Sequence, residues 1–186
     1  TQTSSPSWLC SIFENCISEG CNAPFNSQST ATRSVGNKFY GCISINGNEA
    51  FTTSVSGSGG GLVSSTDTVF ENCLALNSIL FGLRPSSSRN TQVKNCTFYS
   101  STGTGVLIDQ TDPADGGFSS FLTNVLVLGH PAVGIQINTG QISTWKVNYA
   151  NSFANGTNYS PGSSPNLTNS KMIDAMLGSC RLWIPG

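Results

Sequence analysis

The residues that could do chemistry in this chain are its carboxylates, which are few and scattered. Cleavage of a glycosidic bond needs two carboxyl groups about 5 to 9.5 Å apart on one substrate. Glu14 and Glu71 occupy equivalent positions two repeats apart, and we expect about 10 Å between them on one face. The nine acidic residues are Glu14, Glu19, Glu49, Asp67, Glu71, Asp109, Asp112, Asp115 and Asp174. No pair among them predicts a catalytic site.

The densest acidic cluster lies in one turn and comprises Asp109, Asp112 and Asp115. Carboxylates in such a turn could bind calcium, but an ordinary Asp- and Pro-containing turn explains them more simply. The basic residues about one repeat away are Arg84, Arg89 and Lys94. They could complete a lyase-like group, although nothing in their spacing requires it. We therefore predict no metal, no cofactor and no catalytic residue, and we favour a protein that is not an enzyme.

A short phrase recurs along the chain and must position these residues. Five copies have a bend residue followed by a small apolar residue, most often Cys, and a weaker sixth copy has Tyr in that place. The copies are Phe13-Glu14-Asn15-Cys16, Phe39-Tyr40-Gly41-Cys42, Phe70-Glu71-Asn72-Cys73, Val93-Lys94-Asn95-Cys96, Leu122-Thr123-Asn124-Val125 and Lys146-Val147-Asn148-Tyr149. At the Cys position, residues 16, 42, 73, 96, 125 and 149 are 26, 31, 23, 29 and 24 residues apart. Repetition of this kind indicates stacked structural units.

The pattern within each repeat is typical of short strands. Alternating β-branched and aromatic residues are interrupted by Gly, Ser, Asn and Pro, whereas a helical solenoid would need two amphipathic helices per unit. Each repeat therefore predicts two or three strands that form one coil of a β-solenoid. The repeats resemble the right-handed parallel β-helix of pectin-lyase-like proteins and many secreted adhesins, over about residues 10 to 150. This resemblance implies an all-β right-handed parallel β-helix of about five to six coils, and it implies fold rather than function.

The two most regular positions of the repeat have physical explanations. Equivalent residues of stacked coils lie about 4.8 Å apart. Asn tolerates unusual backbone angles, and its amide can bond the next Asn in a stack. The predicted Asn stack comprises Asn15, Asn72, Asn95 and Asn124. A Gly before an aliphatic residue, at Gly82, Gly105 and Gly134, indicates a second position with positive φ or close packing.

The cysteines divide into a column and three others. Cys16, Cys42, Cys73 and Cys96 should stack, and we favour reduced, buried thiols because Cβ atoms in register lie farther apart than the ~3.8 Å that a bridge prefers. Cys10 and Cys21 flank the first strand and are the predicted disulfide, which leaves Cys180 unpaired. With one His and no Cys-x-x-Cys pair, a zinc site is not expected.

Composition limits the compartment and the partners. Only 9% of the 186 residues are charged and the net charge is −1, so nucleic acid is not an expected partner. No apolar run approaches the roughly 20 residues of a membrane span. Thr1 follows no signal peptide, which we interpret as a mature or excised chain of a secreted or extracellular protein. The glycosylation sequons begin at Asn95, Asn155, Asn158 and Asn166. The last three fall in a polar segment, whereas Asn95 belongs to the inner repeat and is the least expected site.

The repeat divides the chain into two parts. Residues 1–150 should form the β-helix with an N-terminal cap, and residues 151–186 a polar loop, a short helix and a closing segment. The helix is predicted over 171–177, with an N-cap at Asn169 or Ser170 and a stop at Gly178. Its apolar residues are Met172, Ile173, Met176 and Leu177.

The first strand after each Asn-Cys pair is apolar on both faces. Only one face can point into a solenoid, because alternate side chains of a strand point in opposite directions. Ile43, Leu74 and Leu126 should then form an outer apolar strip that a protein partner covers. These features predict an extracellular structural or adhesive domain, such as a glycosylated filament subunit, that self-associates or contacts neighbouring domains. The alternative is a carbohydrate-active β-helix enzyme or a phage-spike-like domain that binds a glycan.

Overall fold

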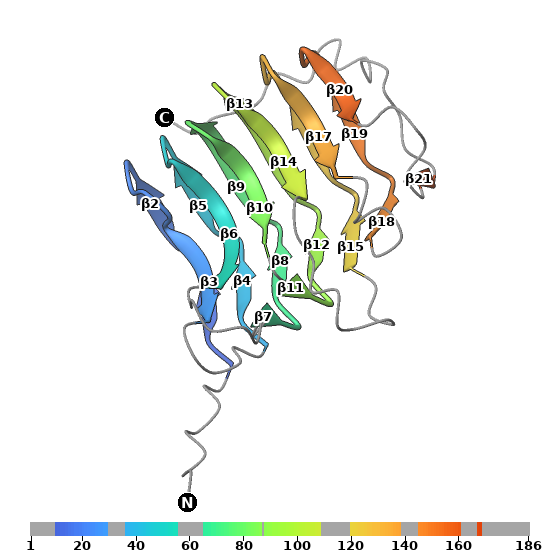
Figure 1. The fold of residues 1–186 in the computed structure, drawn as a ribbon. Helices are drawn as coiled ribbons and strands as arrows, with labels where there is room; N and C mark the ends of the chain where they lie inside the picture. Colours follow the sequence, from blue (N-terminus) through green and yellow to red (C-terminus); the bar gives the residue numbers. More distant parts are fainter. Residues whose placement is uncertain are drawn as a thin grey trace, which may run out of the picture.

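The structure is a computed structural model in which residues 10–29, 36–55, 65–86, 88–108, 120–138, 145–160 and 167–168 are described. All regular structure in these residues is β-strand, and the strands form three parallel sheets that follow one another in every coil. Figure 1 shows the coils stacked in chain order, from β2 to β20. The predicted parallel β-helix is therefore confirmed.

The three sheets each take one strand from every coil, and we call them A, B and C in the order in which the chain enters them. Sheet A contains β1 (Ile12–Glu14), β4 (Lys38–Tyr40), β8 (Val69–Glu71), β12 (Gln92–Lys94), β15 (Ser120–Thr123), β18 (Trp145–Asn148) and β21 (Leu167–Thr168). Sheet B contains β2 (Ile17–Glu19), β5 (Ile43–Ile45), β9 (Leu74–Ser78), β13 (Thr97–Ser101), β16 (Leu126–Leu128) and β19 (Asn151–Phe153). Sheet C contains β3 (Phe25–Ser29), β6 (Glu49–Val55), β10 (Phe81–Pro85), β14 (Thr104–Ile108), β17 (Val133–Ile137) and β20 (Thr157–Ser160). Strands β7 (Ser65–Thr66) and β11 (Ser88–Arg89) pair separately.

A residue in the left-handed backbone region connects sheet A to sheet B in every coil, and we call this bend the A–B corner. The corner residues and their φ angles are Asn15 (52°), Gly41 (60°), Asn72 (56°), Asn95 (54°), Asn124 (53°) and Tyr149 (55°). Asn and Gly are the residues that adopt this region most readily, which explains their recurrence. The Asn124 amide donates to Asn95 Oδ1 at 2.8 Å, so the expected bond between stacked amides forms in this pair.

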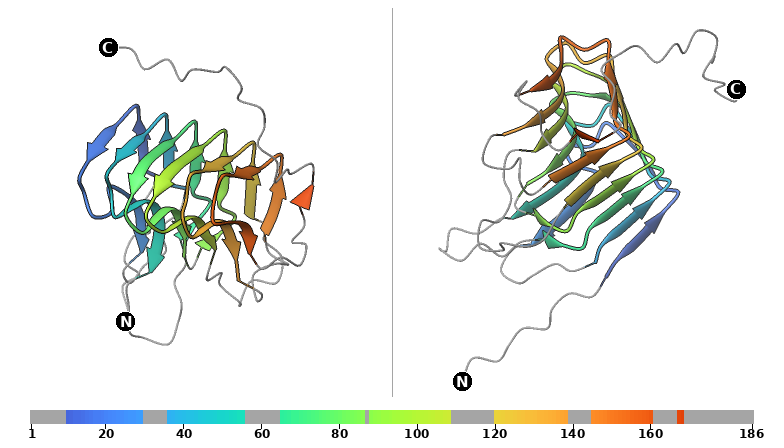
Figure 2. Two further views of the ribbon diagram at one scale, coloured as in Figure 1. Left: turned by 90° about the horizontal axis from the view of Figure 1, so that it is seen from above. Right: turned by 90° about the vertical axis from the view of Figure 1, so that its right-hand side faces the viewer.

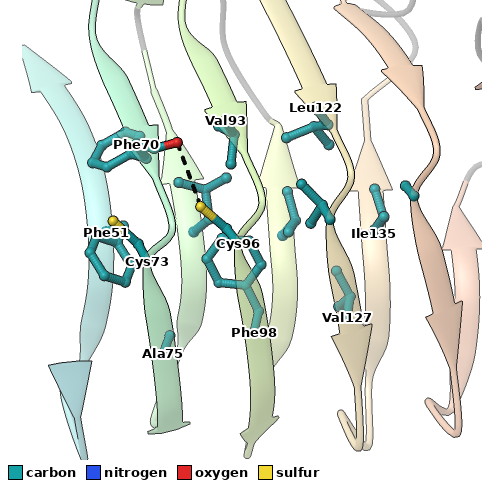
Figure 3. Close-up of a cluster of buried hydrophobic side chains, with 14 of the residues drawn as sticks. Phe51, Phe70, Cys73, Ala75, Val93, Cys96, Phe98, Leu122, Val127 and Ile135 are labelled. Carbon is teal, nitrogen blue, oxygen red and sulfur yellow. Dashed lines mark hydrogen bonds between the residues drawn. The ribbon is translucent and has the colours of Figure 1, made fainter. Parts of the chain in front are cut away.

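The interior consists of columns of stacked apolar side chains, and each sheet contributes one or two such columns. Sheet A contributes stacked rings: the centroids of Phe13 and Phe39 lie 5.0 Å apart, as do those of Phe39 and Phe70. Edge contacts join them to the rings of sheet C, with Phe51 5.7 Å from Phe70. Figure 3 shows how Phe51, Cys73, Val93 and Phe98 converge between the sheets. Equivalent residues therefore pack on one another along the axis as well as across it.

Close packing explains the three glycines that precede an aliphatic residue. Gly82, Gly105 and Gly134 are buried in sheet C without a positive φ, so the alternative of a strained corner is excluded for them. A Cβ at Gly105 would meet the side chains of Val127 and His130, and one at Gly134 would meet Ser152 and Asn155. These glycines leave room for the B–C bend.

The register corrects two sequence-based expectations. Thr123 pairs with Asn148 and Leu126 with Asn151, so Tyr149 is the corner residue of the last coil and Ala150 occupies the Cys position. The sixth copy was therefore aligned one residue too early. The boundary at residue 150 is also too early, because β19 and β20 continue sheets B and C to Ser160. Polar Asn and Ser at exposed strand positions concealed this coil in the sequence. The predicted helix over 171–177, the closing segment and the N-terminal cap lie outside the described residues.

The corner geometry predicts how substitutions at Asn72 rank. Asn72→Ala should lower the free energy of unfolding by about 1 kcal/mol, because Ala is disfavoured in the left-handed region. Asn72→Gly should stay close to the parent, since Gly adopts that region freely. Urea unfolding of the three proteins measures the difference. Equal losses in both variants would contradict a backbone origin for the Asn preference.

Candidate binding surfaces

The outward side of sheet B is apolar across four adjacent strands. Its side chains form two columns along the solenoid, and we call this surface the B face. The B face comprises Ile43, Ile45, Leu74, Leu76, Thr97, Tyr99, Leu126 and Leu128. All are partly or largely exposed, and none is charged. Ile17 of β2 extends the first column and is 69% exposed.

Buried and partly exposed side chains alternate along these strands, and this alternation shows which face points inward. Ala75, Phe98 and Val127 lie between the B-face residues and are at most 1% exposed. The outward orientation predicted for Ile43, Leu74 and Leu126 is therefore correct, and their register places them in one column with Thr97. Each is partly shielded by its stacked neighbours. An uncharged strip of this extent is typical of a surface that contacts another molecule.

A shallow hollow adjoins the B face at the A–B corner. Its volume is about 340 Å³, at the lower end of the range of ligand pockets. The corner residues Asn95, Asn124 and Tyr149 line one part of it. Thr97, Leu126 and Asn151, at the start of the sheet B strands, line the other part. The lining combines amides with one aromatic ring, so the hollow is suited to binding.

The cysteine column lies where the repeat predicted it. The described cysteines are all free thiols, and Cys42, Cys73 and Cys96 are buried. Each of these thiols donates to a backbone carbonyl of the preceding coil: Cys42 to Phe13, Cys73 to Phe39 and Cys96 to Phe70. The last bond, at 3.5 Å, is the dashed line in Figure 3. Cys16 is only partly buried because it lies in the first coil.

The environment keeps the thiols of Cys42 and Cys96 protonated. Burial raises the pKa of the Cys42 thiol to about 11. The hydrogen bond with the Cys73 thiol, together with burial, raises the pKa of Cys96. The same hydrogen bond lowers the pKa of Cys73. Since the thiolate is the reactive form, the raised pKa values of Cys42 and Cys96 indicate a packing role for these two thiols rather than nucleophilic chemistry.

The predicted disulfide between Cys10 and Cys21 is wrong. Both are free and exposed, and they lie at different bends of the first coil. The Cys10 thiol donates to the carbonyl of Gly36, and the Cys21 thiol to that of Glu19 at 3.6 Å. The two cysteines flank the first Asn-Cys pair in the sequence. They lie apart in the structure because strands β1 and β2 separate them.

The candidate catalytic groups do not gather in the described residues. Glu14 and Glu71 share a column of sheet A with Tyr40 between them, as predicted. Arg84 of sheet C is 3.2 Å from Glu49 Oε1 in an ion pair, while Lys94 belongs to sheet A. Within the described ranges no group of three His, Cys, Asp or Glu could hold a metal ion. The acidic turn with Asp109, Asp112 and Asp115 lies outside them.

His130 has a structural role that the sequence did not reveal. It is 1% exposed, with Nε2 3.0 Å from the carbonyl of Phe98, and its backbone N–H donates to Asn155 Oδ1 at 2.8 Å. Burial lowers its pKa, against the smaller opposite effect of the Phe98 carbonyl. His130 is thus a neutral residue that joins neighbouring coils, and it cannot reach a substrate.

The sequons lie in unlike surroundings. Asn95 is exposed at the A–B corner and not in the interior, contrary to its expected placement. Asn155 is not in an open loop: its amide donates to Val127 O at 3.2 Å and to Ser152 Oγ at 3.1 Å. Asn158 is partly buried in β20, and its Oδ1 accepts from Asn155. Asn166 lies outside the described residues. Of the described sequons, Asn95 is therefore the most accessible.

Comparisons with known proteins do not extend this description. No family model and no curated protein matches the chain. Similar solved structures include full-length QnrB1, a plasmid-mediated fluoroquinolone resistance protein, with 8% identity, a TM-score of 0.24 and coverage of 91% of this chain and 96% of that one. Its trypsin-treated form has 12% identity, a TM-score of 0.22 and coverage of 91% and 94%. Similarity at this level carries no argument about family or function. The described residues also contain no helix able to cross a membrane.

The thiol column predicts a pattern of chemical labelling. At pH 8, a maleimide should modify Cys10 and Cys21 in the native protein and leave Cys42, Cys73 and Cys96 unmodified. All of them should react after denaturation without reductant, because none is bridged. Peptide mass spectrometry gives the modified positions. A native Cys73–Cys96 bridge, or rapid labelling of Cys42, would be incompatible with a reduced and buried column.

Proposed function

We propose that this chain is a secreted structural or adhesive β-helix domain that associates with a second copy of itself through the B face. The observation that carries the proposal is the uncharged, apolar outer surface of β5, β9, β13 and β16. In a soluble protein an antiparallel or parallel sheet keeps its outer face polar unless something covers it. Here the B face would be covered by the same sheet of a second copy.

A second copy fits the shape and chemistry of the B face. Two sheet faces pack about 10 Å apart with their side chains interdigitated, and a two-fold axis brings the same patch of both molecules together. Leu74, Leu126 and their neighbours would each contribute about 1.5–3 kcal/mol if fully buried. The low charge of the chain, 9% of residues, adds little repulsion between copies.

Growth into a filament requires a contact besides the two-fold one. The first coil supports such a contact. Ile12 is 57% exposed, and Phe13 is 42% exposed although its ring stacks on Phe39. Copies that meet at this end would continue the aromatic column of sheet A.

We further propose that the chain belongs to the pectin-lyase-like class of secreted β-helices and that the sequon at Asn166 carries a glycan in a host that glycosylates. The three parallel sheets per coil support the first assignment, and the polar sequence before Asn166 supports the second. A carbohydrate-cleaving activity has no comparable support, since the described carboxylates do not pair across a common cleft.

Substitution of one B-face residue should separate the copies. Leu74→Lys places a charge at the centre of the contact, where its desolvation is costly, so the apparent mass should fall to that of a single chain. The matched control is Ile79→Lys, because Ile79 is 51% exposed at the bend after β9 and outside the B face. Light scattering coupled to size-exclusion chromatography measures the mass, and circular dichroism checks that both variants fold.

The control and the parent should have the same, higher mass. If Leu74→Lys associates as the parent does, or if the parent is a single chain at all concentrations, the proposed assembly is wrong. A different result would have another meaning. If the parent is monomeric and Leu74→Lys is folded but strongly destabilised, part of the same chain covers the B face.

A further inference from the structure

The hollow beside the B face contains Tyr149, the one bulky residue among the A–B corner residues that the structure describes. Tyr149 has φ 55°, and the neighbouring corner residues in the stack, Asn95 and Asn124, have nearly the same angle. A left-handed conformation is tolerated by Asn and Gly, whereas for a bulky residue it is a strained outlier. The Tyr149 ring is 57% exposed, so burial in the fold does not offset this strain. Strain retained with an exposed ring points to a contact with a ligand.

A buried polar atom next to Tyr149 points in the same direction. Asn151 Oδ1 is inaccessible to solvent in this structure and has no hydrogen-bond partner, and Asn151 lines the hollow. A buried acceptor without a donor costs free energy. A small rearrangement of the side chain toward a ligand hydroxyl would satisfy it.

The stacked amides supply further polar groups. Asn124 uses one N–H to reach Asn95 Oδ1. An amide has two donor hydrogens and two acceptor lone pairs, so Asn95 and Asn124 keep both donors and acceptors for a ligand. Groups of both kinds on adjacent coils, about 4.8 Å apart, match a ligand rich in hydroxyls.

The absence of charged residues in the lining favours a neutral ligand among those rich in hydroxyls. The residues that line the hollow include no Lys, Arg, His, Asp or Glu. An anionic polymer would therefore find no cation there, while a neutral sugar needs none. The apolar face of a sugar ring packs on an aromatic side chain, and its hydroxyls bond amides.

We propose that this hollow binds a neutral oligosaccharide, with one sugar ring on Tyr149 and hydroxyl groups bonded to Asn124 and Asn151. The site lies at the edge of the B face and shares Thr97 and Leu126 with it. It adds a ligand to the proposed assembly and does not depend on that assembly. Repetition of the amides along the axis suits a chain of sugars that runs parallel to the solenoid.

The test uses a substitution that the fold already accepts. Tyr149→Asn installs the residue present at four other A–B corners, so the corner should remain folded while the ring is lost. The control Tyr40→Ala removes a partly exposed tyrosine on the outer side of sheet A, outside both the hollow and the B face. The full chain and both variants are run by native electrophoresis in gels that contain dextran, galactomannan, xyloglucan, mixed-linkage β-glucan or polygalacturonate.

The parent and Tyr40→Ala should be retarded by at least one neutral polysaccharide, with retardation weakened roughly tenfold in Tyr149→Asn, as expected from loss of an aromatic contact. Thermal unfolding should show Tyr149→Asn to be at least as stable as the parent, since strain is relieved. Retardation by none of the neutral polysaccharides, by polygalacturonate alone, or equally in parent and Tyr149→Asn would overturn the proposal. The oligomeric mass of Tyr149→Asn should equal that of the parent, which separates this outcome from a failure of the B-face assembly.

Discussion

The structure depends on a single left-handed residue at each A–B corner. With φ near 50–60°, residues such as Asn72 turn the chain sharply enough that the next residue, Cys73, points into the core. A side chain larger than Cys, Val or Ala would not fit directly inside this bend, because stacked copies already fill it. The corner therefore sets the register of sheets A and B, and with it which side chains of sheet B face outward. Figure 2 shows the sheets meeting at these bends in every coil.

The same constraint fixes which of the two apolar sides of sheet B faces the core. Its inward column of Ala75, Phe98 and Val127 fills the space beside the cysteines. Its outward columns, which include Leu74 and Leu126, have no role in that core. Their burial lowers the free energy only when another surface covers them. Because they form a contiguous patch, they differ from the single apolar residues that proteins commonly expose. The proposed assembly surface and the proposed sugar-binding hollow therefore adjoin each other on the outer side of sheet B.

How much could be predicted from sequence depended on how local each feature is. The Asn-Cys phrase at Asn72 and Asn95 revealed the fold because its backbone and packing requirements are met within one bend. The B–C bends were missed, since Asn46, Asn77, Gly129 and Ala154 adopt positive φ with no shared neighbouring phrase. Contacts between coils were also beyond sequence reasoning: the roles of His130 and Asn155 come from partners 25 or more residues away. The same limit produced the incorrect disulfide.

The assembly through the B face can be tested most directly by cross-linking at its centre. In a chain with Cys10, Cys21 and Cys180 replaced by Ser, Thr97→Cys places a thiol in the first column of the face, between Leu74 and Leu126. Leu107→Cys is the matched control, because Leu107 is similarly half-exposed on the outer side of sheet C. Under mild oxidation the account predicts a covalent dimer from Thr97→Cys and none from Leu107→Cys. No dimer from Thr97→Cys, or equal amounts from the two variants, would contradict it.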